Sequence, residues 1–195
     1  PDLKPSKETK DIIVETPLLK VTLIDLGGGI KSVKLKQYKE TVKETKDKEM
    51  VEDIKPYTFS PKVFKTANNE IIDDSTFFKA SKGNFTVNDK EDVITFVGVL
   101  TDGTKVKKSY KFYPDSYTID MNVEIESTDN NITLLDFVMV TGKNESSYTF
   151  KGPFVFNGKK FEQIEKLEKN IEVPKDFNYA CLDDGFFAFI LIPQE

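Results

Sequence analysis

An unbroken alternation of apolar and polar residues between Tyr117 and Glu126 constrains the fold of this chain more than any other feature. The apolar positions are Tyr117, Ile119, Met121, Val123 and Ile125, and a polar residue follows each of them. Side chains of a β-strand point alternately to its two faces, so the pattern predicts an antiparallel strand with one buried face. Such a strand needs hydrogen-bonded neighbours, and we therefore expect β structure around it.

The residues before this strand carry the signals of two more strands joined by tight turns. The run Val93–Leu100 is apolar, and the dipeptide Asp102-Gly103 after it is favoured in hairpins. After this turn, alternate positions are expected to share one face of a strand, and its members are Val106, Lys108, Tyr110 and Phe112. Pro114-Asp115 predicts the next turn. Together these segments predict an antiparallel meander.

The N-terminal part of the chain reads as two strands around a glycine triplet. Ile12–Val14 and Leu18–Leu26 are apolar runs separated by Pro17, which suits a strand start or an edge. Gly27–Gly29 can adopt the backbone angles of a tight reversal, and the alternation resumes in Ile30–Tyr38. A phosphate-binding loop would need a helix after the glycines, whereas a strand pattern follows them. The triplet therefore predicts a structural turn.

Many short strands with turn signals and little helix predict an all-β antiparallel sandwich. Further strands are expected at Tyr57–Phe59, Val63–Phe64, Phe77–Ala80, Phe85–Asn88, Ile132–Val140 and Phe154–Phe156. The apolar run Phe186–Ile192 predicts a central strand buried on both faces. The charged stretch Thr41–Lys55 predicts a long loop that leaves the sheet.

One segment gives conflicting signals. Phe161, Ile164, Leu167 and Ile171 follow the spacing of a helical stripe, with Glu and Lys between them, and this pattern favours a helix. The hairpin dipeptide Asn157-Gly158 just before them instead predicts a returning strand. The sequence leaves helix or strand open for Phe161–Ile171.

The composition excludes several classes of function. Histidine and tryptophan are absent, and all 28 basic residues are lysines, so arginine is absent too. Without histidine the chain lacks the commonest general base and metal ligand, and a Ser-His-Asp triad is impossible. Without arginine, and with a net charge of −5, the chain is a poor candidate for binding nucleic acid. We expect no catalytic residue, no metal site and no cofactor.

The remaining polar motifs have structural readings that we prefer. Asp73-Asp74 and Asp183-Asp184 are paired acids, but neighbours in an extended chain point to opposite faces and seldom converge on one ion. We read both pairs as loop residues, with Asp183-Asp184-Gly185 forming a turn before the last strand. Three glycosylation-type sequons begin at Asn84, Asn131 and Asn144, and we assign them no function.

The single cysteine and the hydropathy of the chain bear on where it works. Cys181 cannot form an internal disulfide, and we expect a small buried hydrophobic residue rather than a reactive thiol. One buried thiol fits both a cytosolic and a periplasmic protein. No run approaches the roughly 20 apolar residues of a membrane span. The polar, proline-containing residues 1–10 predict a linker.

A set of ordered motifs resembles the periplasmic domain of the YidC membrane-protein insertase family. The first is the strand from Val14 to Leu23, the glycine turn, and the strand Ile30–Tyr38, which ends in Leu35-Lys36-Gln37-Tyr38. The later ones, in chain order, are Thr101–Phe112, Tyr117–Val123, Phe150–Pro153, Lys160–Ile164 and the apolar strand Gly185–Pro193. The family often has tryptophan in that last strand, where this chain has Phe186 and Phe187.

The resemblance implies a fold, a location and partners. The fold would be a β-supersandwich similar to that of galactose mutarotase, spanning residues 11–195. Residues 1–10 would link it to a preceding membrane helix, and further strands would follow Glu195. The implied function is a non-catalytic accessory module, interacting or chaperone-like, on the periplasmic side of the bacterial inner membrane. Its implied partners are SecDF of the Sec translocon and nascent membrane proteins. The alternative from a different class is a carbohydrate-binding or mutarotase-like supersandwich protein.

Overall fold

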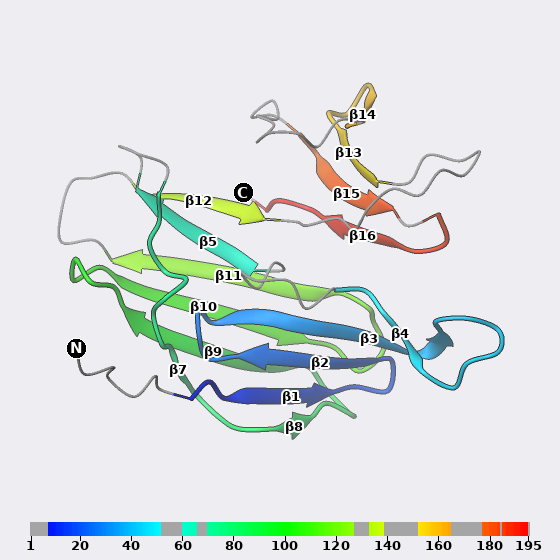
Figure 1. The fold of residues 1–195 in the computed structure, drawn as a ribbon, viewed down its shortest axis with the longest axis horizontal. Coiled ribbons are helices and arrows are strands. Elements are labelled where there is room, and N and C mark those ends of the chain that lie inside the picture. Colours follow the sequence, from blue (N-terminus) through cyan, green and yellow to red (C-terminus); the bar gives the residue numbers. More distant parts are fainter. Residues whose placement is uncertain are drawn as a thin grey trace, which may run out of the picture. The chain divides into compact units, whose positions relative to one another are not determined.

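The computed structural model describes residues 8–51, 60–65, 70–126, 133–138, 152–164, 177–183 and 185–194. All regular structure within these ranges is β-strand, which confirms the all-β prediction (Figure 1). No helix in this part of the chain is long and apolar enough to cross a membrane. The chain divides into two compact units, Pro1–Val140 and Thr141–Glu195.

The first unit holds three sheets. One has the order β4-β3-β2-β1-β8, with β1 Asp11–Glu15, β2 Leu19–Ile24, β3 Gly29–Lys39, β4 Asp47–Glu49 and β8 Phe85–Thr86. The next has the order β11-β10-β9-β7, with β7 Lys79–Ala80, β9 Asp92–Val99, β10 Lys105–Phe112 and β11 Ile119–Glu126. A small third sheet has the order β12-β5-β6, with β5 Ser60–Lys65, β6 Glu70–Ile71 and β12 Thr133–Val138.

The second unit holds one sheet of four antiparallel strands. Its order is β14-β13-β15-β16, with β13 Gly152–Phe156, β14 Phe161–Gln163, β15 Tyr179–Asp183 and β16 Ala188–Leu191. The rings of Phe154, Phe156, Phe161 and Tyr179 form an aromatic row across it.

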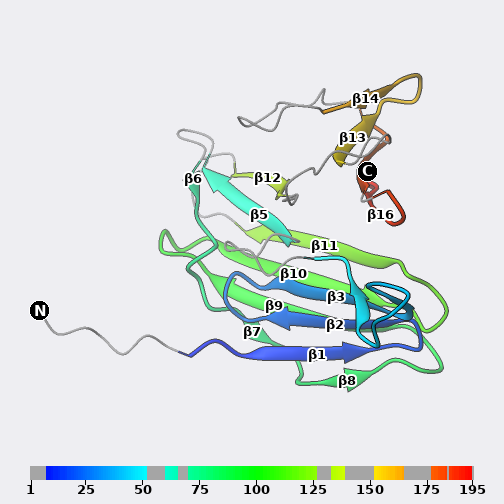
Figure 2. The same ribbon diagram turned by 45° about the vertical axis from the view of Figure 1, so that its right-hand side comes forward.

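The two larger sheets of the first unit pack face to face (Figures 1 and 2). β10 presents Val106, Lys108, Tyr110 and Phe112 to the interior, all of them fully buried. Phe112 meets Phe85 of the opposite sheet edge-on, with ring centroids 6.2 Å apart. The opposite sheet contributes buried side chains from β1 to β3, among them Val14, Leu19, Val21, Leu23, Ile30 and Val33. The alternation read from the sequence therefore specifies which face of each strand enters this core.

Three expectations need correction. The stretch Thr41–Lys55 was expected as a loop, yet Asp47–Glu49 forms β4 against β3. This strand contains no apolar residue, so the sequence pattern does not predict it. It is held by backbone pairing and by the Glu49 carboxylate, which accepts a hydrogen bond from the Val33 amide at 2.8 Å. The predicted central strand in Phe186–Ile192 is wrong as well. β16 ends its sheet, and Ile190 and Ile192 are 51% and 60% exposed within the described part of the chain.

The third correction concerns the ambiguous segment. Phe161–Gln163 is a strand, so the preference for a helix is wrong there and the hairpin reading is confirmed. The Asn157 side chain accepts hydrogen bonds from the amides of Lys159 and Lys160, and Gly158 has a φ of 83°. This turn returns the chain onto β13, where local turn geometry overrides helical spacing. Ile164 follows this strand, and its amide donates to the Pro153 carbonyl at 3.0 Å. Leu167 and Ile171, like Tyr57–Phe59, lie outside the described residues.

Candidate functional site

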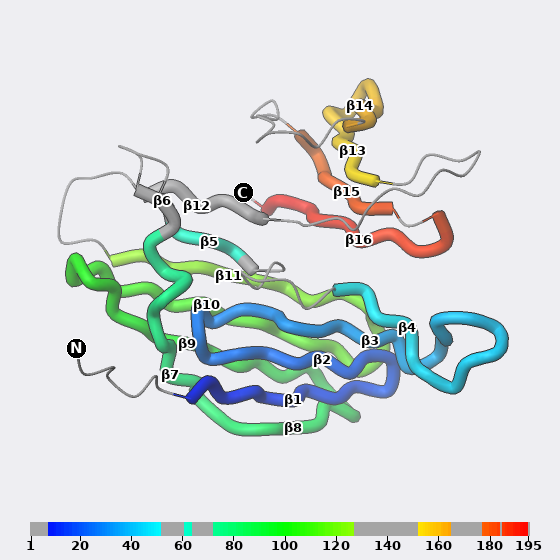
Figure 3. The backbone as a smooth tube through the Cα atoms, in the orientation of Figure 1, coloured from blue at the N-terminus to red at the C-terminus, as the bar shows by residue number. Residues whose placement is uncertain are grey.

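The glycine turn between β2 and β3 is the centre of a polar cluster in the core of the first unit. Gly27 and Gly28 have φ angles of 73° and 60°, in the left-handed region that glycine adopts without strain. The Gly27 amide donates to the Thr76 carbonyl at 2.8 Å, because the segment between β6 and β7 runs beside the end of β2 (Figure 3). The turn thus holds that segment, which confirms the structural reading of the triplet.

The carbonyl oxygens of this turn accept hydrogen bonds from the opposite sheet. Lys108 Nζ donates to the Gly27 carbonyl at 2.7 Å, and the Tyr110 hydroxyl donates to the Gly28 carbonyl at 2.6 Å. Both donors lie on the inward face of β10. A phosphate-binding loop presents backbone N–H groups to its ligand, whereas this turn presents carbonyl oxygens to two donors. The local geometry is therefore unsuited to an anion.

The Lys108 ammonium is fully buried and has three acceptors. Besides the Gly27 carbonyl, it donates to the Pro61 carbonyl of β5 at 2.8 Å and to Asp73 Oδ2 at 2.6 Å. Its Nζ also lies 5.1 Å from the centroid of the Phe78 ring. An ammonium has three N–H donors, so these acceptors satisfy all of them. Lys108 thereby connects β10, the glycine turn, β5 and the segment that follows β6.

The two acids of the Asp73-Asp74 pair point to different lysines. Asp73 is fully buried against Lys108, whereas Asp74 forms an ion pair with Lys62, whose side chain is also buried. Both acids lie in the segment between β6 and β7, as the loop reading of the pair predicts. The cluster balances two carboxylates with two ammonium groups, which is what buried charges need. Asp73 Oδ1 is the one buried side-chain oxygen without a hydrogen-bond partner among the described residues.

Burial shifts the pKa values of Lys108 and Tyr110 in this cluster. It lowers the pKa of Lys108 below its ordinary value, and the neighbouring Asp73 carboxylate opposes that shift. Burial and the charge of Asp73 both raise the pKa of Tyr110, so its phenol stays protonated and continues to donate to Gly28. A lysine that acts as a base needs a free lone pair and access to substrate. Lys108 has neither while it is charged, sealed and bound to three acceptors, so the cluster is a structural element of the core.

The cysteine, the second acid pair and the first sequon asparagine also have structural roles. Cys181 is 1% exposed, and burial raises the pKa of its thiol to about 11, which agrees with a buried hydrophobic residue. The Asp183 side chain accepts a hydrogen bond from the Gly185 amide at 2.6 Å, as expected of a turn before the last strand. Asn84 accepts from the Ile13 amide at 2.9 Å and ties β1 to the start of β8. Asn131 and Asn144 lie outside the described residues.

No group of three or more histidine, cysteine or acidic residues suited to a metal ion occurs in the described part of the chain. The sequence pattern places Lys108 on the same strand face as Val106, Tyr110 and Phe112, but it identifies neither the burial of that face nor a partner for the lysine. A charged residue inside an otherwise apolar inward row was the signal, since such a charge must be paired. The partner could not be read from the sequence because Asp73 and Lys108 are separated by 35 residues and belong to different elements.

Comparison with known proteins gives consistent matches over nearly the whole chain. The family model described as the YidC periplasmic domain matches residues 11–195. The protein named membrane protein insertase YidC from Syntrophus aciditrophicus (strain SB) is 26% identical over 202 residues, covering 97% of this chain and 37% of the relative. Its namesakes from Citrifermentans bemidjiense and Geobacter metallireducens are each 27% identical, covering 91% and 96% of this chain. The chain spans between 35% and 37% of the length of these relatives.

Proposed function

The chain belongs to the YidC periplasmic domain family, a non-catalytic family within an inner-membrane insertase, and from this membership we propose its function. It acts as an accessory interaction and chaperone-like module in the insertion and folding of inner-membrane proteins, and it contacts SecDF. The observation that carries the proposal is the family match from residue 11 to residue 195. The absence of histidine and arginine from the sequence supports a role that depends on surfaces.

We also propose that residues 11–195 form one domain with the supersandwich fold of galactose mutarotase, and that residues 1–10 link it to a membrane helix. The packed antiparallel sheets of the first unit support this fold, because a supersandwich is built from such layers. The motifs shared with the family, which extend from Val14 to Pro193, support the domain boundaries.

Two experiments test the proposal. The complete reading frame should encode one membrane helix before this domain and several after it, and a frame without them would refute membrane tethering. In cells, deletion of the domain from the full-length insertase should reduce the amount of SecDF that co-purifies with it. Unchanged co-purification and unchanged insertion of membrane proteins would instead identify the domain as a spacer. Saturable heat in a calorimetric titration with hexoses would favour the carbohydrate-binding alternative.

A further inference from the structure

In the first unit, the sheet β11-β10-β9-β7 has one long edge without a partner among the described strands. β11 ends the order β11-β10-β9-β7 and pairs with β10 over all eight of its residues, without a register shift. Its other edge receives no pairing from a strand of the described chain. The small sheet has the order β12-β5-β6, and none of its three strands pairs with β11 within the described residues. An edge strand of this length presents a row of free backbone N–H and C=O groups.

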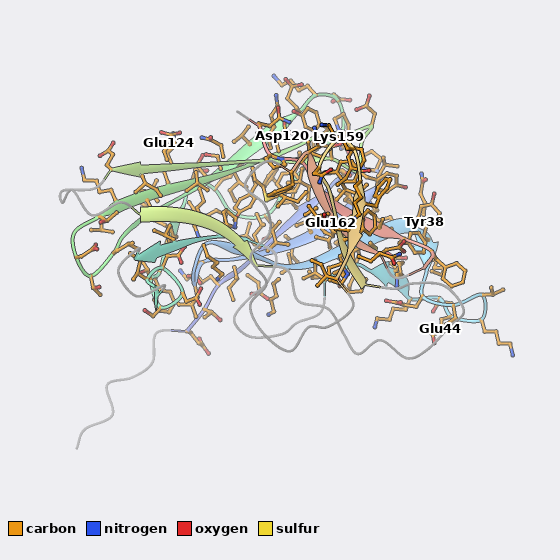
Figure 4. The ribbon with its side chains drawn as sticks, turned by 90° about the horizontal axis from the view of Figure 1, so that it is seen from above. Tyr38, Glu44, Asp120, Glu124, Lys159 and Glu162 are labelled. Carbon is orange, nitrogen blue, oxygen red and sulfur yellow. The ribbon has the colours of Figure 1, made fainter. Side chains whose placement is uncertain are left out.

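The side chains of β11 divide into an apolar row and an acidic row. Ile119, Met121, Val123 and Ile125 are half-buried and continue the inward row of β10 beyond the core. The alternate positions are exposed and consist of Asp120, Asn122, Glu124 and Glu126. Figure 4 labels Asp120 and Glu124 along this strand. β11 lacks the proline and the bulges that block many edges, and the charges that could protect its edge are all acidic.

The acidic row is only partly neutralised. Lys107 pairs with Glu124 at 2.8 Å and Lys105 pairs with Glu126 at 3.5 Å, both from the β10 side. The two glutamate side chains remain 55% and 78% exposed. A strand added on the free edge could therefore form the same pairs that β10 forms. β10 itself is the pattern for such a partner, because it alternates lysines on this face with mainly apolar residues on the other.

The charge of the row argues against a second copy of the chain as the occupant. Two β11 strands paired antiparallel about Asn122 would place Asp120 opposite Glu124. Pairing about Val123 would place Asp120 opposite Glu126. Like charges directly opposite each other destabilise a sheet, so these two registers of self-association are disfavoured. A partner with lysines at these positions is favoured for the same reason.

We propose that the free edge of β11 binds an extended polypeptide segment in which lysines alternate with apolar residues, by adding it as a further strand. Backbone hydrogen bonds supply affinity, and the two rows supply specificity. The lysines face Asp120, Glu124 and Glu126, while the apolar side chains cover the half-buried row. This inference rests on the proposed function as an interaction module and gives that module a place and a ligand chemistry.

The test uses the 195-residue chain and a labelled peptide of four Lys-Val repeats, followed by fluorescence anisotropy at low ionic strength. We expect saturable binding, accompanied by slower hydrogen exchange of β11 amides. Glu124→Lys should weaken binding about fivefold or more, since one favourable cross-strand pair becomes a repulsive one. The matched control is Glu44→Lys, which makes the same charge change in the exposed loop between β3 and β4, away from β11, and should bind normally (Figure 4).

Two further peptides separate strand addition from simple charge attraction. A peptide of four Glu-Val repeats should not bind. The Lys-Val peptide N-methylated at every second residue keeps its charge but cannot pair along one edge, and it should lose its affinity. Equal weakening by Glu124→Lys and Glu44→Lys, or full binding of the methylated peptide, would overturn the proposal. So would complete protection of every β11 amide in the free chain. These results would leave the SecDF co-purification unaffected, so the two proposals can fail separately.

Discussion

Lys108 carries its charge into the core of the first unit, and the structure gives it three oxygen acceptors there. Removing an ion from water costs several kcal/mol, so such a group is stable inside only when it is paired and hydrogen-bonded. Here the same pairing connects the glycine turn, β5 and Asp73. The lysine therefore links segments that lie far apart in the sequence.

Replacing Lys108 by methionine should be strongly destabilising. The variant leaves the Asp73 carboxylate buried without a counter-charge, and breaking a buried pair in this way costs about 3–5 kcal/mol. Urea denaturation measures the free energy of unfolding. The control Lys107→Met removes only an exposed pair on the neighbouring position and should cost less than about 1 kcal/mol. The double variant Lys108→Met with Asp73→Asn removes both charges of the pair. Its loss in free energy of unfolding should therefore be smaller than the sum of the losses of the two single variants. Equal costs for Lys107→Met and Lys108→Met would contradict this account.

The glycine turn offers a second test at the residue scale. Gly28 has a φ of 60°, and a Cβ added there would lie 3.1 Å from Cγ of Phe78. Gly28→Ala should therefore cost at least about 1–2 kcal/mol, the strain of an ordinary residue in the left-handed region. Gly83 is a matched control, because an added Cβ meets nothing within 4 Å. In thermal unfolding, the melting temperature of Gly83→Ala should equal or slightly exceed that of the parent protein. A similar fall in melting temperature for both variants would rule out the geometric explanation.

The pKa of Cys181 predicts a dependence on pH. Burial raises it to about 11, above the value of about 8.5 for a free thiol. As the pH rises, the unfolded chain therefore loses this proton first. The stability that the neutral thiol contributes is complete below about pH 8.5 and is lost as the pH rises through about 11. Urea denaturation at pH 8 and pH 10 measures the free energy of unfolding, which should fall more between these pH values for the parent protein than for Cys181→Ala. Parallel curves for the two proteins would contradict the shift.

Individual strands could be predicted from the sequence where one face is buried, and not where pairing depends on polar contacts. β10 and β11 follow from alternation because the core selects one row of each strand, whereas β9 follows from an apolar run before a hairpin dipeptide. β4 could not be predicted, since Asp47–Glu49 contains no apolar residue and owes its pairing to Glu49. β16 was misplaced because an apolar run alone does not distinguish a central strand from an edge. The cluster around Lys108 escaped prediction because it depends on tertiary contacts.

The two faces of β9 should respond differently to truncation. Phe96 is fully buried and meets the Tyr110 ring edge-on, with centroids 6.0 Å apart, whereas its neighbour Val97 is 48% exposed. Phe96→Ala should reduce the free energy of unfolding by about 3–5 kcal/mol. Val97→Ala should cost less than about 1 kcal/mol, because little area is removed from the core. Urea denaturation of the two variants measures this difference, and similar losses would mean that β9 does not present one face to the interior.

At the scale of the whole molecule, the two compact units differ in the size of their cores. In the second unit the buried apolar side chains among the described residues are Val155 and Cys181, whereas the first unit has a sandwich core that includes Phe96, Tyr110 and Phe112. Under the proposal of one domain over residues 11–195, the second unit should unfold together with the first.

Cooperative unfolding of the two units can be measured with a destabilising change in one unit and a probe in the other. Cys181, in the second unit, is 1% exposed and reacts with thiol reagents only when its surroundings open. Lys108→Met acts in the first unit. If residues 11–195 unfold cooperatively, this variant should lower the urea midpoint of Cys181 labelling by the same amount as the midpoint followed by far-UV circular dichroism. A labelling midpoint that stays at the parent value while the dichroism midpoint falls would show two independent domains. The exposed variant Lys107→Met should move neither midpoint appreciably, because its ion pair lies at the surface.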